Sequence, residues 1–218
     1  MIFNSVDFLI FFPVVTLIYF IIPRKARYVW LLIASYFFYM CWNAKYALLL
    51  LTSTVVTWLC ARLVHAAKKP VMRKLILAVC LCVNLGILFF FKYFDFFLAN
   101  CNRILSALHM EIPEKGFDVL LPVGISFYTF QALGYTIDVY RGKVAPEKNI
   151  LRYALFVSFF PQLVAGPIER SGSLLGQLRD LERKKLWNYE NVTGGLTLMV
   201  WGLFIKMVIA DRVAILVN

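Results

Sequence analysis

Polar side chains recur on one face of an otherwise apolar stretch, residues 120–142. Their separations alternate between four and three residues, the spacing of one helix face: Gly124, Tyr128, Gln131, Tyr135 and Asp138. A polar face on a membrane helix is costly unless it meets other protein or water. Such a face must line something inside the protein, a cavity that we call the tunnel, and we take the four polar members as candidates to line it.

Two positions in this stretch carry further expectations. Gln131 lies near its middle, where burying a primary amide without partners costs several kcal/mol. Its amide must therefore bond to another helix or into a cavity. Asp138 and Arg141 are three residues apart and can pair on one face. Either they form an interfacial salt bridge that fixes the helix end, or they belong to the tunnel.

Charged residues interrupt the last apolar run, residues 192–217. Only fourteen residues separate Val192 from Lys206, too few to cross a bilayer, so Lys206 lies within the membrane or snorkels out of it. Its helix face includes two glycines, which would allow another helix to approach closely: Gly195, Met199, Gly202 and Lys206.

Two interpretations of these charges stay open. One is a structural ion pair, in which Lys206 or Arg212 meets an acid such as Asp138 or Asp211. The other places Lys206 and Asp211 in the tunnel, because ionisable groups inside membranes often mark functional sites.

A third segment with polar residues, 159–170, overlaps the end of a short apolar run at 151–165. Pro161, Gly166 and Pro167 stand close together, and a regular helix is unlikely to pass through them. We expect this run to enter the membrane and return, with an ordinary short helix ending at Pro161 as the alternative. The segment adds three tunnel candidates: Gln162, Glu169 and Arg170.

Other familiar chemistries are not evident. His65 and His109 are poor catalytic candidates, since one follows an apolar run in a basic loop and the other lies outside any clear span. The five cysteines lie mostly in or beside apolar runs and are expected to pack as small apolar groups. No zinc spacing, phosphate-binding loop or nucleophile elbow occurs, and we expect no metal or bound cofactor.

The elements that hold these residues are membrane helices. Hydrophobic residues make up 61% of the 218, against roughly 45–50% in soluble domains. Apolar runs are expected at seven places: 7–22, 28–42, 46–64, 75–98, 119–140, 151–165 and 192–217. The fold prediction is an all-α polytopic bundle, a single membrane domain over 1–218, with about six spans and the re-entrant segment.

Loop charges give the orientation. The net charge is +11, and the basic residues gather in short clusters between apolar runs, as in cytoplasmic loops. Their alternation favours an extracytoplasmic N-terminus, and the pattern excludes a signal peptide and a nucleic-acid-binding domain. Residues 171–187 are expected to form a short surface helix with Leu174, Leu178 and Leu181 on one face, and Asp95–His109 a similar one on the outer side.

Three ordered motifs carry a family resemblance: LPVGISFYTFQALGYTIDVYRG at 121–142, FFPQLVAGPIER at 159–170 and GLFIKMVIADR at 202–212. They resemble the membrane-bound O-acyltransferase family, and most closely its bacterial branch that includes alginate O-acetyltransferases. The opening MIFNSVDFLIFF and the following PRKAR are also similar to that branch.

The resemblance implies an enzyme of the plasma membrane. Such enzymes move an acyl group, usually acetyl, from acetyl-CoA or an acyl carrier to a hydroxyl of an extracytoplasmic polysaccharide. The bilayer, that acceptor and a periplasmic or extracellular acyltransferase are the implied partners, with no nucleic acid. The alternative is a non-enzymatic channel or export subunit for acyl groups or glycan.

The family's catalytic histidine is expected beyond Asn218. Members are longer chains and carry this histidine in a Trp-His-type motif in their second half. Neither His65 nor His109 lies in such a motif, and the chain stops inside an apolar run, as a truncated chain would. We therefore expect an N-terminal half that is inactive alone.

Overall fold

The computed structural model describes residues 3, 5–106, 122–163, 166, 171–181 and 188–217. In these residues the regular structure is helical and contains no strand, which confirms the all-α prediction. The chain divides into two compact units, described separately here: 28–179, and 1–27 together with 180–218. The expectation of one membrane domain stays a prediction.

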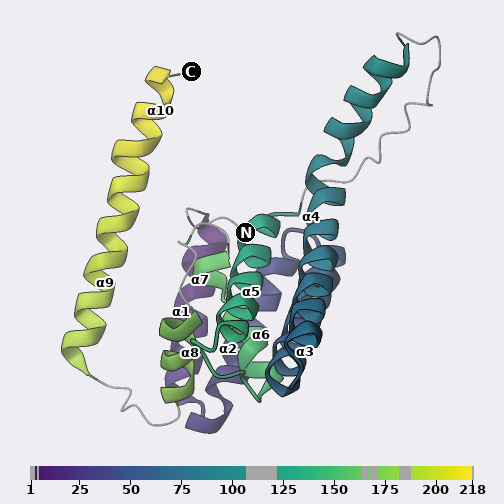
Figure 1. Cartoon of the computed structure of the whole chain (residues 1–218). Coiled ribbons are helices and arrows are strands. Elements are labelled where there is room, and N and C mark those ends of the chain that lie inside the picture. The colour runs from purple at the N-terminus through teal and green to yellow at the C-terminus, as the bar shows by residue number, and fades with distance from the viewer. Residues whose placement is uncertain are drawn as a thin grey trace. The chain divides into compact units, whose positions relative to one another are not determined.

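The helices follow one another along the chain (Figure 1). Their bounds are α1 Val6–Ile21, a 3₁₀ turn Arg24–Ala26, α2 Arg27–Met40, α3 Ala44–Ala66, α4 Pro70–Ser106, α5 Ile125–Tyr140, α6 Ile150–Ser158, α7 Phe160–Leu163, α8 Ser171–Asp180, α9 Tyr189–Phe204, a π-helix Ile205–Ala210 and α10 Asp211–Val217.

Residues 28–179 form a bundle around α3. Helices α3, α4 and α5 pack against one another, and α6 packs against α3 and α5 (Figure 1). Large side chains that are almost wholly buried fill the space between them: Leu50, Tyr128, Tyr135, Tyr153 and Phe156. Asparagines start two of these helices, since Asn43 caps α3 and Asn149 caps α6 through their side-chain oxygens.

A layer of polar side chains runs through the bundle. Ser53 Oγ donates to Asn84 Oδ1 at 2.6 Å, and Asn84 Nδ2 donates to the Cys80 carbonyl at 2.9 Å. From α6, Tyr153 donates its hydroxyl proton to Thr57 Oγ1 of α3 at 2.9 Å. Buried polar groups need such partners, so these bonds fix which faces of the helices meet.

The helix is interrupted near Pro161, as expected, but the interruption lies at Phe159, before the proline. Helix α6 ends at Ser158, Phe159 takes φ −54° and ψ 110°, and α7 begins at Phe160. Pro161 lies in the first turn of α7, where its missing N–H costs nothing. The chain therefore makes two short helices here. Whether the pair enters and leaves the membrane on one side stays a prediction.

Of the two expected surface helices, one does not form and the other does. Helix α4 continues without interruption to Ser106, so Asp95–His109 forms no separate helix over its described part, 95–106. Residues 87–106 contain neither glycine nor proline, so nothing breaks the helix. Helix α8 does form, but it buries Leu175 and Leu178, while Leu174 is half-buried.

Three of the described helices are long and apolar enough to cross a membrane: Ala44–Ala66, Pro70–Phe94 and Tyr189–Ala214. Two shorter apolar segments, Val6–Ile21 and Ile150–Leu163, accompany them. A chain of this kind is a membrane protein, while the count of six spans stays a prediction.

Candidate functional site

The polar face of α5 lies inside the bundle. Tyr128, Gln131 and Tyr135 are all buried, and each lies on the face of α5 that the spacing predicts. Helix packing therefore covers the face, and the polar groups meet protein.

The break between α6 and α7 creates the partner of Gln131. In a continuous helix the Phe156 carbonyl would accept from the N–H of Phe160. That N–H instead donates to Ser35 Oγ on α2 at 3.2 Å. The Phe156 carbonyl then accepts from Gln131 Nε2 at 2.8 Å. The expectation that Gln131 bonds across helices is confirmed.

A glycine seats the start of α5 against the end of α7. Gly124 has φ +74°, which non-glycine residues rarely adopt. A Cβ built there would lie only 2.5 Å from the Leu163 carbonyl oxygen. The α5 N-terminus and the α7 C-terminus can meet this closely because residue 124 has no side chain.

Tyr135 connects α5 to the loop that follows it. Its hydroxyl accepts from the Glu147 N–H at 2.7 Å, and its ring centre lies 4.7 Å from that of Tyr153. Toward the other end of α5, Tyr128 approaches Tyr39 of α2 closely enough for their hydroxyls to interact. Neither of those hydroxyls makes a hydrogen bond of standard geometry.

Glu147 is a centre of contacts that the sequence did not single out. Its carboxylate accepts from Arg179 Nε at 2.7 Å and lies 3.6 Å from Arg152 Nη1. Its carbonyl accepts from Trp58 Nε1 at 2.9 Å. The residue is only 4% exposed. The carboxylate thus meets α6 and α8, while the backbone of the same residue meets α3 and α5.

A sequence signal for Glu147 did exist. It is the single acid among the basic residues of 141–152. A lone acid in a basic segment close to apolar runs suggests a local ion pair, but its partner Arg179 is 32 residues away in the chain. Sequence spacing alone does not bring those two together.

The other candidates of this unit are less deeply placed. Asp138 is half-buried, Arg141 is exposed, and Gln162 of α7 is buried. Glu169 and Arg170 lie outside the described residues. The structure therefore joins α5 to α6 through Gln131 and to α7 through Gly124, and leaves Arg141 at the surface.

The ion pair expected for Lys206 is present, with Asp211 as its partner. The π-helix is what makes it possible. In an α-helix residues five apart point about 140° away from each other. Here the Asp211 N–H donates to the Lys206 carbonyl, an i→i+5 bond, and the two side chains share one side. The predicted ion pair is thus present, and a tunnel role for the two residues stays a prediction.

The described residues provide groups that bind and orient more than groups that move protons. Histidine is the side chain best suited to act as a base near neutral pH. The described part contains one, His65, exposed at the end of α3, and His109 lies outside that part. Over the same residues no three metal-ligating side chains converge.

Comparison with known proteins gives several relatives. The peptidoglycan O-acetyltransferase of Helicobacter pylori is 38% identical over 244 residues, covering 98% of this chain and 45% of the relative. The probable alginate O-acetylase AlgI of Pseudomonas syringae pv. tomato is 36% identical, covering 100% of this chain and 42% of the relative. The protein of that name from Azotobacter vinelandii is 34% identical.

These matches confirm the resemblance carried by the three motifs. The chain is homologous over nearly its whole length to proteins named as O-acetyltransferases, and it spans less than half the length of each. No family model and no solved structure matches it.

Proposed function

We propose that this chain is the N-terminal part of a membrane-bound O-acyltransferase. The enzyme transfers an acyl group, here proposed to be acetyl, to hydroxyls of an extracytoplasmic polysaccharide. The observation that carries the proposal is homology over 98–100% of the chain to relatives named for peptidoglycan and alginate O-acetylation. The two names share an acceptor class, a polysaccharide hydroxyl.

In this proposal the chain builds one wall of the reaction chamber. Transfer to a hydroxyl needs a base that takes its proton as the oxygen attacks the acyl carbonyl. We place that base on a histidine beyond Asn218. The face of α5 forms the wall opposite that histidine. Gln131 holds this face to α6, and Tyr135 holds it to the following loop. Reacting groups must be held to within fractions of an ångström, so a rigid wall contributes to rate.

The finer parts of the proposal follow the family. The donor is acetyl-CoA or an acyl carrier, reached from the side of the basic loops, and the acceptor lies outside. The protein lies in the plasma membrane with its N-terminus outside, and a periplasmic or extracellular acyltransferase completes the pathway.

The direct test is genetic and chemical. The reading frame that contains this chain is deleted and then restored on a plasmid, and acetate released from purified polysaccharide by mild base is measured. We expect the deletion to remove ester-linked acetate and the plasmid to restore it. Unchanged acetate in the deletion strain would overturn the proposal. The 218-residue chain expressed alone should restore none.

A passive channel is the competing function. The polar face of α5 fits it equally well, since the bonds of Gln131 and Tyr135 to protein hold that face in place for either function. Gln131→Leu and Lys206→Met separate the two: lost acetylation with intact glycan export supports the enzyme, and lost export supports the channel.

A further inference from the structure

The helix formed by α9, the π-helix and α10 exposes two different faces. Residues 189–214 are long and apolar enough to cross a membrane, and none of that stretch is buried in the described protein. A helix of this kind meets lipid on some sides and protein on others, and its side chains should differ accordingly.

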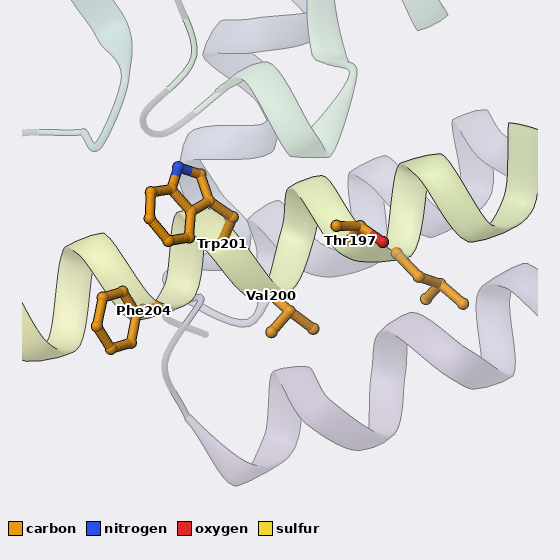
Figure 2. Close-up of a pocket in the computed structure, with 5 residues that line it drawn as sticks. Thr197, Val200, Trp201 and Phe204 are labelled. Carbon is orange, nitrogen blue, oxygen red and sulfur yellow. The ribbon is translucent and has the colours of Figure 1, made fainter.

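One face carries bulky apolar groups. Five side chains of α9 lie on this side (Figure 2): Leu196, Thr197, Val200, Trp201 and Phe204. The rings of Trp201 and Phe204 stack with centres 5.7 Å apart. This side has only two side-chain polar groups: the Thr197 hydroxyl, which bonds back to the Thr193 carbonyl, and the indole N–H of Trp201. We call it the bulky face.

The opposite face carries two glycines and a charged pair, together with Met199 between the glycines. At 100° per residue, Gly195 points about 160° away from Thr197, and Gly202 about 160° away from Phe204. Space beside both glycines is open, since a Cβ at either would meet no atom within 4 Å. Lys206 and Asp211 continue this side, with side chains 60% and 41% exposed. We call it the glycine face.

The Lys206–Asp211 ion pair restricts what can lie against the glycine face. Ionisable groups in membrane segments face other protein or water, because hydrocarbon leaves their remaining hydrogen-bonding capacity unmet. The pair is neutral overall, so it does not need a third charge. It needs donors and acceptors, such as a serine, threonine, asparagine or glutamine side chain. Glycines at the same side let another backbone come close enough to provide them.

We propose that the glycine face, Gly195, Gly202, Lys206 and Asp211, docks a further transmembrane helix of the same polypeptide, which offers a hydrogen-bonding side chain to the ion pair. The length of the relatives favours this occupant, since this chain spans only 42–45% of them. The bulky face then meets lipid. This docking does not depend on the chemistry proposed above.

Matched single cysteines test the assignment. The longest polypeptide that contains this chain is expressed in its membrane with all its native cysteines replaced by alanine, including the five of this chain. Gly202→Cys is compared with Phe204→Cys, and Gly195→Cys with Thr197→Cys. Each pair lies two residues apart, at nearly equal depth and on opposite faces. A lipid-soluble maleimide reports access from the bilayer.

We expect rapid labelling at Phe204→Cys and Thr197→Cys, and loss of most labelling at Gly202→Cys and Gly195→Cys. Equal labelling within both pairs would overturn the proposal. Disulfide-linked dimers formed on oxidation of Gly202→Cys would assign the face to a second copy and would also overturn it. If a glycine variant does not accumulate, the other pair decides. Polysaccharide acetylation is not measured, so failure of the proposed function leaves this result intact.

Discussion

At the scale of single residues, the α5 face contains two tyrosines in contrasting states. Tyr135 accepts a hydrogen bond from the Glu147 N–H, while the Tyr128 hydroxyl has no partner of standard geometry. Removing an acceptor leaves a buried N–H unpaired, whereas removing a poorly bonded hydroxyl costs little.

The two tyrosines therefore give a matched prediction. Tyr135→Phe should destabilise the protein by about 1–3 kcal/mol, because the buried Glu147 N–H loses its partner. Tyr128→Phe should be nearly neutral for stability. Thermal unfolding in detergent measures both. Equal losses would contradict the assignment. If Tyr128 lines the tunnel, its variant lowers polysaccharide acetylation at unchanged stability.

Glu147 gives a second prediction at this scale. Glu147→Gln keeps the shape but removes the charge that Arg152 and Arg179 share, so it should cost about 1–3 kcal/mol. Arg179→Ala should cost less, since Arg152 still neutralises the carboxylate and Arg179 is 40% exposed. Unfolding measurements on both variants check the order, and a larger loss in Arg179→Ala would refute it.

At the scale of helices, the junction of α5 with α7 depends on a position without a side chain. Gly124→Ala forces a Cβ to within 2.5 Å of the Leu163 carbonyl oxygen, at a positive φ. We expect a loss well above the roughly 1–2 kcal/mol of the backbone strain alone. Gly134→Ala is the control: it lies inside α5 with open space around it, and should be neutral or stabilising. Unfolding temperatures of the two variants decide, and similar values would contradict the junction.

Sequence reasoning succeeded where the signal is periodic or local. The four-three spacing predicted the buried face of α5, and Pro161 predicted an interruption within two residues of where it lies, at Phe159. It failed where contacts join distant segments. The Phe160 N–H finds Ser35 across 125 residues, and Trp58 meets Glu147 across 89. Neither pairing follows from residue types alone. The π-helix was also missed, since its sequence is uniformly apolar around Lys206.

At the scale of the whole molecule, a native cysteine can report which way the protein is oriented in the membrane. Cys101 lies near the end of α4, on the side that the loop charges assign to the exterior. An impermeant maleimide added to intact cells should label Cys101, while buried Cys80 stays unreacted. With the other exposed cysteines replaced, labelling only after lysis would invert the predicted orientation.

The length of α4 has a practical consequence. At 1.5 Å per residue, its 37 residues span about 55 Å, against a hydrocarbon core of about 30 Å. No glycine or proline interrupts its last twenty residues, so the excess leaves the bilayer as a stiff rod. A binder raised against that rod would be rigidly coupled to the bundle and would give a small membrane protein a landmark for electron-microscopic alignment.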